Sequence, residues 1–198
     1  MNYHRCLNKT GYIISKKHVD AKILENIKKE LTVSPIILQA YKDFVKPNEF
    51  EIFQESQNYL YLPRFYGIEK FGQPLKNFLS DGIPMNLTFT YSLLPHQIKA
   101  YNNTLNALRE CGGGVLQIYC GGGKTALAIK IATDLQCKTL VVVNKECLMD
   151  QWADSITKFT GGQARIGTLQ QSKIDVENKD FVIAMLHSLC KRLYQTTI

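Results

Sequence analysis

The most informative stretch of the sequence is VLQIYCGGGKTALAIKIA, residues 115–132. The apolar residues Val115, Leu116 and Ile118 precede three consecutive glycines, and further apolar residues follow at helical spacing. This order predicts a strand, a glycine loop and a helix, which is the context that a phosphate-binding loop needs.

Each residue type in this loop has a chemical role in binding phosphate or Mg²⁺. Glycines lack a Cβ, so successive backbone N–H groups can turn toward phosphate oxygens, and a helix that begins near the last glycine adds its positive dipole end. Lys124 would place a cation on the β- and γ-phosphates, and the Thr125 hydroxyl would ligate Mg²⁺, which makes these two residues the catalytic candidates. The predicted ATP contacts are completed by Gly121, Gly122, Gly123 and Ala126.

The loop matches only the second half of the usual spelling G-x-x-x-x-G-K-[ST], because Ile118 stands where the first glycine belongs. A glycine-rich turn beside a solvated lysine is the alternative reading. The apolar run before the loop and the amphipathic pattern after it favour nucleotide binding.

Composition describes a soluble globular chain of 198 residues, 45% hydrophobic and 21% charged, with room for one large domain or two small ones. No apolar run reaches membrane-spanning length, and the N-terminus lacks the apolar core of a signal peptide. The six cysteines are scattered without a C-x-x-C pair, which indicates reduced thiols in a cytosol-like compartment. The net charge of +7 suits a polyanionic partner, but it forms no dense basic stripe.

The pattern along the chain predicts a small α+β domain at residues 1–90 and an α/β domain at residues 91–198. The first would hold a strand at 11–15, a helix at 20–31 with Asp20 as its cap, a hairpin at 49–63 and a strand at 87–91. The aromatic residues between Tyr59 and Phe71 invite base stacking, although core packing is the favoured explanation.

The second domain alternates helices and strands, which predicts a parallel, doubly wound sheet. Helices are expected at 95–110, 146–159 and from 187 to 194. Strands are expected at 115–118, 138–143, 164–169 and 181–186.

At this point the order of segments resembles the first RecA-like domain of a superfamily-2 helicase, nearest the XPB-like branch with its large-DNA-virus transcription helicases. LPHQ at residues 94–97 resembles the family's L-R-P-Y-Q entry, in which a glutamine reads the adenine edge, so the resemblance gives Gln97 that role. Leu94 and His96 replace the family's arginine and aromatic residue, and Tyr119 replaces a proline.

Three later segments also resemble family motifs. VVVNKECLMDQW at residues 141–152 resembles V-V-V-x-K-x-x-L-x-x-Q-W, IGTLQ at 166–170 resembles G-x-I-Q, and AMLHSL at 184–189 resembles A-T-x-Q-S-L. The resemblance implies nucleic-acid contacts by Asn144, Lys145, Gly167 and His187. A lysine beside the amides of a helix N-terminus is physically suited to a phosphate.

The resemblance covers about half of the chain, and residues 1–90 match only loosely, through LPRFYG at 62–67, as an accessory domain. The chain contains no Asp-Glu dipeptide, which the family needs for Mg²⁺ and for the attacking water. We expect that the chain is truncated before that motif and before the second RecA-like domain. We therefore expect weak ATP binding and almost no hydrolysis by these residues alone.

The favoured interpretation is the N-terminal part of an ATP-dependent DNA helicase or translocase, a hydrolase with ATP and Mg²⁺ as cofactors. Its expected partners are single-stranded or duplex DNA and the transcription machinery, with no membrane. A viral member would work in the host cytoplasm or the virion, and any other in the nucleus. The alternatives are a nucleic-acid-binding module with a vestigial nucleotide site and a P-loop enzyme of another kind, such as a kinase.

Overall fold

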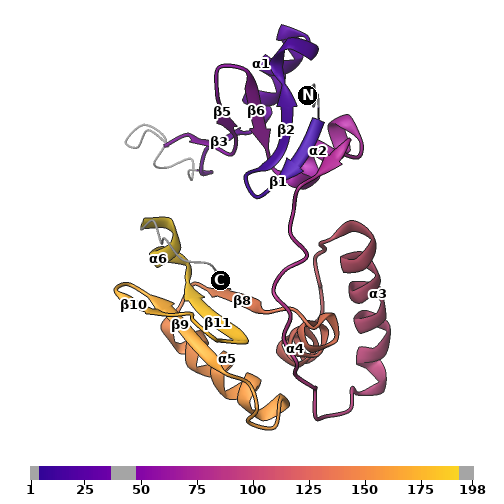
Figure 1. Ribbon diagram of the computed structural model, residues 1–198, viewed down its shortest axis with the longest axis vertical. Helices are drawn as coiled ribbons and strands as arrows, with labels where there is room; N and C mark the ends of the chain where they lie inside the picture. The colour runs from indigo at the N-terminus through magenta and orange to yellow at the C-terminus, as the bar shows by residue number, and fades with distance from the viewer. Residues whose placement is uncertain (1–4, 37–47, 192–198) are drawn as a thin grey trace. The chain divides into compact units, whose positions relative to one another are not determined.

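The computed structural model describes residues 5–36 and 48–191, and the chain divides into two compact units, Met1–Asp81 and Gly82–Ile198 (Figure 1). The sequence suggested a boundary between residues 90 and 91. In the structure Met85 and Leu87 lie in the core of the second unit, and the Met85 amide donates to the Gln136 carbonyl oxygen at 2.9 Å. The segment 82–90 therefore packs with the second unit.

The first unit is a small α+β fold. Among its described residues, five strands form a sheet in the order β5-β6-β2-β1-β7, antiparallel except for the β1–β7 pair, and β3 pairs with β4. Its elements are β1 (Arg5–Asn8), β2 (Gly11–Ser15), η1 (Lys16–His18), α1 (Ala21–Glu30), β3 (Thr32–Val33), β4 (Phe50–Glu51), β5 (Gln54–Glu55), β6 (Tyr59–Leu62), α2 (Arg64–Phe71) and β7 (Lys76–Asn77).

Local sequence signals explain these elements. The Asp20 carboxylate accepts from the Lys22 amide at 2.8 Å, which caps α1 as predicted, and Ile27 turns into the core. The predicted hairpin is confirmed by the antiparallel β5–β6 pair. The sequence of residues 36–45 is ambiguous between strand and helix, and all of this segment except Ile36 lies outside the described residues.

The core of the first unit forms between the sheet and its helices. Tyr12 is fully buried, and its hydroxyl donates to the Gly72 carbonyl oxygen at 3.0 Å. Tyr66 and Phe71 pack against this core, as the core-packing interpretation expected, whereas Tyr59 and Phe65 are 40% and 49% exposed. Core packing therefore accounts for only part of the aromatic cluster.

The second unit is an α/β fold with a mostly parallel sheet, as predicted. The described strands lie in the order β10-β9-β11-β8, with β11 parallel to both neighbours and β10 antiparallel to β9. Its elements are α3 (Pro95–Cys111), α4 (Lys124–Leu135), β8 (Thr139–Val143), α5 (Glu146–Phe159), β9 (Ile166–Gln170), β10 (Lys173–Asp175), β11 (Phe181–Met185) and α6 (Leu186–Lys191).

Both faces of β11 are covered, whereas Leu140 and Val142 of β8 are 41% and 46% exposed. Figure 1 shows α5 running along one face, where Ile183 of β11 packs with Met149 and Ile156 of α5. On the other face Val182 and Ala184 of β11 pack with Leu189 of α6. All five residues of β11 are buried, which explains its continuous apolar sequence.

Two predicted strands are wrong. Residues 115–118 pair with no strand among the described residues, and Val115 is 97% exposed. Residues 87–91 are extended without strand pairing, because the Leu87 carbonyl oxygen accepts from the Gln136 side chain and the Thr90 amide donates to the Phe159 carbonyl oxygen. The sequence missed β10, a short edge strand. Residues 192–194 of the helix predicted from 187 to 194 lie outside the described residues.

Within residues 5–36 and 48–191, no helix combines the length and the apolar character that crossing a membrane requires.

Candidate nucleotide-binding site

The predicted phosphate loop turns sharply into helix α4, which begins at Lys124. Gly121 and Gly123 have φ angles of +83° and +84°, a left-handed conformation that residues with a Cβ rarely adopt. Gly123 is the N-cap of α4, and neither a capping side chain nor an acidic residue is present in the first turn. The positive end of the helix dipole is therefore not compensated by a side chain.

Gly122 and Gly123 are also required by their surroundings. A Cβ on Gly122 would lie 2.2 Å from Ile118 Cγ2, and a Cβ on Gly123 would lie 2.1 Å from Gln97 Nε2. A Cβ on Gly121 would meet nothing within 4 Å. The loop is therefore packed against its own preceding segment on one side and against α3 on the other.

Lys124 interacts with the loop itself. Its ammonium group donates to the carbonyl oxygens of Ile118 and Tyr119, both at 3.0 Å, and the Gly122 amide also donates to Tyr119 at 3.2 Å. The Lys124 ammonium group thus lies at the loop, where an anion would bind, but it is hydrogen-bonded to backbone carbonyl oxygens. Binding of a phosphate group requires this lysine to exchange those carbonyls for phosphate oxygens.

Gln97 lies against the phosphate loop and is only 6% exposed. Its side-chain amide donates to the Gly122 carbonyl oxygen at 3.2 Å, and its side-chain oxygen accepts from the Leu94 amide at 3.0 Å. The structure brings the predicted base-reading residue into contact with the predicted phosphate-binding residues. Both ends of its amide group already have protein partners.

His96 and Tyr119 form an aromatic pair beside the loop. In the sequence these two residues stood out only as departures from the family pattern. The rings of His96 and Tyr119 have centroids 6.1 Å apart at an interplanar angle of 37°, and Tyr119 is 65% exposed. His96 directly precedes Gln97 in the sequence, and the Tyr119 carbonyl oxygen accepts a hydrogen bond from the Lys124 ammonium group. Only the three-dimensional contact reveals the pair.

A polar network joins α3 to the last turns of α4, at the end of the helix away from the loop. The Tyr101 hydroxyl donates to the Asp134 carboxylate, which also accepts from Lys130 at 2.6 Å. Burial, followed by the hydrogen bond to Asp134, raises the pKa of Tyr101 to about 12. This network fixes α3, and with it Gln97, relative to the helix that carries Lys124 and Thr125.

Three of the four predicted nucleic-acid residues lie at one edge of the sheet. The parallel register pairs Val143 of β8 with Met185 of β11, so Asn144, Lys145 and His187 all follow the carboxyl ends of neighbouring strands. All three are exposed, and Lys145 is the N-cap of α5 with no side-chain capping bond. Polar groups at the carboxyl ends of parallel strands are the usual ligand-binding positions in α/β sheets.

The fourth predicted residue, Gly167, does not join them. It pairs with Val182 near the start of β11, and a Cβ there would lie 2.0 Å from the Asp175 carbonyl oxygen. It is a buried glycine that allows close approach of the backbone. Gln170, at the carboxyl end of the same strand, donates to the Glu146 carboxylate at 3.3 Å and is the residue of this segment that lies at the edge.

The hydrogen-bond donors of the loop and the Thr125 hydroxyl group fit a nucleoside triphosphate with Mg²⁺. The loop offers three glycine positions without side chains, an uncapped helix start and the Lys124 cation. Thr125 and Ala126 follow, half-buried, in the first turn of α4. Amides and a lysine suit phosphate oxygens, and a threonine hydroxyl suits Mg²⁺.

A glycine loop at the start of a helix, beside a mostly parallel sheet, defines a nucleotide-binding α/β unit of the P-loop class. Residues 90–198 match the model of the family described as type III restriction enzyme, res subunit. The chain belongs to this family, and with it to the superfamily-2 helicase class that the motif order predicted.

Viral proteins are among its relatives. The chain is 34% identical over 195 residues to a putative ATP-dependent RNA helicase, L396, of Acanthamoeba polyphaga mimivirus, covering 97% of this chain and 37% of that protein. It is 30% identical over 106 residues to the putative helicase 109L of Invertebrate iridescent virus 3, covering 50% of this chain and 31% of that protein. The chain thus spans about a third of the length of these relatives.

Among solved structures, a Sulfolobus solfataricus SWI2/SNF2 ATPase core in complex with dsDNA is similar at 21% identity with a TM-score of 0.46. The similarity covers 57% of this chain and 25% of that chain.

Proposed function

We propose that this chain forms the ATP-binding part of an ATP-dependent DNA helicase or translocase of the XPB-like branch. The observation that carries the proposal is the contact between Gln97 and the Gly122 carbonyl oxygen, at 3.2 Å, immediately before the start of α4. It unites a base-reading amide with a phosphate loop in one site. With the boundary that the packing of residues 82–90 indicates, residues 82–198 would form the first RecA-like domain and residues 1–81 an accessory domain.

In this proposal the nucleotide lies against the loop, and Gln97 exchanges its hydrogen bonds to Gly122 and Leu94 for the edge of the base. The amides of Gly121 to Ala126 and the Lys124 ammonium group hold the phosphates, and the Thr125 hydroxyl holds Mg²⁺. Bound ATP supplies a phosphoanhydride whose hydrolysis can drive movement. The residues of this chain bind and orient the nucleotide. Its sequence contains no Asp-Glu pair to hold Mg²⁺ and position water, so we expect very little turnover by these residues alone.

The nucleic acid would lie at the carboxyl edge of the sheet. Lys145 and the first amides of α5 suit a backbone phosphate, with Asn144 and His187 beside them and Gly167 acting only through the packing of β9. We propose DNA, with the transcription machinery as a partner, because the motif order is that of the XPB-like branch. The mimivirus relative is named an RNA helicase, so RNA is the competing substrate.

Titration with a fluorescent ATP analogue tests the nucleotide site. Lys124→Ala should weaken binding by at least about tenfold, because the charge-assisted contact to phosphate is lost. Lys173→Ala removes the same charge from an exposed position on β10 and should leave the affinity unchanged. Equal affinities for the Lys124→Ala variant and the parent chain would refute the assignment of the loop.

A nucleic-acid-binding module with a vestigial nucleotide site is the second candidate. Its supporting observation is that Lys124 already occupies the loop by bonding to the Ile118 and Tyr119 carbonyl oxygens. Binding of labelled DNA and RNA oligonucleotides with and without ATP distinguishes the two. ATP should change the affinity for the preferred nucleic acid if the site is coupled, and should change neither affinity if it is vestigial.

A further inference from the structure

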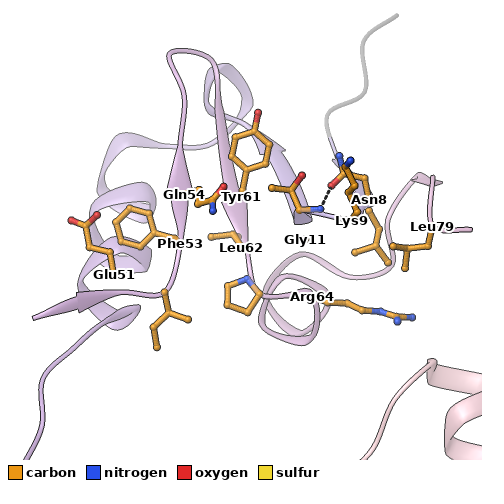
Figure 2. Close-up of a pocket in the computed structure, with 14 residues that line it drawn as sticks. Asn8, Lys9, Gly11, Glu51, Phe53, Gln54, Tyr61, Leu62, Arg64 and Leu79 are labelled. Carbon is orange, nitrogen blue, oxygen red and sulfur yellow. Dashed lines mark hydrogen bonds between the residues drawn. The ribbon is translucent and has the colours of Figure 1, made fainter. Parts of the chain in front are cut away.

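A hollow of about 490 Å³ belongs entirely to the first unit. Its walls come from the β1–β2 turn, the β4–β5 segment and the end of β6 (Figure 2). We propose that this hollow binds single-stranded nucleic acid, with a base against Tyr61 and a phosphate group near Lys9 and Arg64. This inference goes beyond the proposed function and rests on it only for the kind of ligand.

The turn that carries Lys9 is held in place before any ligand binds. Gly11 has a φ angle of +125°, and a Cβ there would lie 2.4 Å from the Leu62 carbonyl oxygen, so the turn lies directly against the end of β6. The Thr10 amide donates to the Asn8 side chain at 2.8 Å, the bond drawn in Figure 2. A preformed hollow loses little conformational entropy when a ligand enters.

The charges of the hollow are polarised. Figure 2 shows Lys9 and Arg64 toward one end and Glu51 toward the other. A phosphate group is attracted to the two cations and repelled by the carboxylate. The Glu51 carboxylate can instead accept a hydrogen bond from a base, such as that of the N3–H group of thymine. The polarity therefore places the backbone of a strand at the Lys9 end and a base at the other.

Aromatic and amide groups line the middle of the hollow. Tyr61 lies on β6, where backbone pairing with Ile13 and Gln54 fixes its position, and its side chain is half-buried. Phe53, next to Gln54, packs against the core of the unit instead, so Tyr61 is the ring available to a base. Bases stack on aromatic faces, and amide side chains such as that of Gln54 bond base edges. An acidic peptide would use the cations but leave these faces unused, so a single strand fits better.

Fluorescence anisotropy of labelled dT12, with the full 198-residue chain and no nucleotide, tests the proposal. Lys9→Glu should weaken binding about tenfold at low salt, because an attractive phosphate contact becomes repulsive. Lys17→Glu makes the same charge change at an exposed position of η1 outside the hollow, and should weaken binding less than about twofold. Equal losses for the two variants would overturn the proposal, because binding would then follow net charge alone.

A second measurement examines stacking and location. Tyr61→Leu keeps an apolar side chain on β6 but removes the ring, and should weaken dT12 binding about fivefold or more. A 4-thiothymidine oligonucleotide should cross-link to residues 48–64. Cross-links confined to residues 82–191, or an octaglutamate peptide that binds as tightly as dT12, would overturn the single-strand assignment. Binding of the fluorescent ATP analogue is measured separately from this nucleotide-free binding, so the two proposals can fail separately.

Discussion

Gly123 shows how one residue serves both local geometry and the candidate site. Its φ angle of +84° lets the chain turn into α4, and its missing side chain leaves room for the Gln97 amide. Two independent physical requirements therefore select glycine at this position. The Gln97 amide donates to Gly122 beside it, so the same small space joins the residues proposed to read the base and to bind phosphate.

Gly123→Ala should destabilise the second unit by about 2 kcal/mol, because it adds left-handed backbone strain and a clash with Gln97. The measurement is urea unfolding followed by the fluorescence of Trp152, the only tryptophan of the chain. The double variant Gln97→Ala, Gly123→Ala removes the clash but not the strain, so it should recover part of the loss. An unchanged unfolding midpoint for Gly123→Ala would contradict this account.

At the scale of elements, an ion pair clamps the starts of two parallel strands. Asp180 precedes β11, is 4% exposed, and accepts from the Arg165 guanidinium at 2.7 and 2.9 Å and from the Arg165 amide at 2.9 Å. The hydrogen bonds from the Arg165 guanidinium lower the pKa of the Asp180 carboxyl group, and they outweigh the opposing effect of burial. Ionised Asp180 therefore stabilises the β9–β11 pairing.

The pH dependence follows from this direction. A carboxyl group whose pKa is lower in the folded state contributes stability above its unfolded pKa of about 4, and that stability is lost as pH falls through the folded pKa. Asp180→Asn should therefore be less stable than the parent chain at pH 7, and the difference should shrink below about pH 4. Urea midpoints measured between pH 7 and pH 3 test this. A difference that is constant over the range would show that ionisation of Asp180 contributes nothing.

Sequence patterns predicted the elements whose local signals and tertiary contacts agree. The apolar run of β11 is buried on both faces, and α5 begins and ends at the predicted residues, 146 and 159. The run at residues 115–118 has the same apolar character, but a strand also needs a hydrogen-bonded neighbour, and none is present among the described residues. Residues 87–91 alternate like a strand yet bond to Gln136 and to the end of α5.

Some residues of the candidate site can likewise be predicted from the sequence, and others depend on contacts that only the structure reveals. The spelling of the loop predicts Gly121 to Thr125 as phosphate-binding residues, because each position has a chemical requirement that is visible in the residue type, and this assignment stays a prediction. The His96–Tyr119 pair and the position of Gln170 depend on contacts between distant segments, which no local pattern records. Gly167 matched a motif, but its register beside Val182 shows a packing role.

At the scale of the whole molecule, the described residues of the two units form separate cores that share no residue. One is built around Tyr12 and Leu60 in the first unit, and the other around Ile156 and Ile183 in the second. Each core is closed by its own sheet and helices. Damage to one core should therefore leave the stability of the other nearly unchanged.

Gly67→Ala tests this separation. A Cβ on Gly67 would lie 2.3 Å from Tyr12 Cγ, so the substitution overpacks the first core and should cost it about 3 kcal/mol. Trp152 lies on α5 in the second unit, so its fluorescence reports only the second core. We expect far-ultraviolet circular dichroism to show an early transition that the Trp152 signal lacks. Gly114→Ala, where the new Cβ would lie 3.6 Å from Ala107 Cβ, is the matched control and should change neither signal. A Trp152 transition that moves together with the circular dichroism in Gly67→Ala would mean that the two units unfold as one.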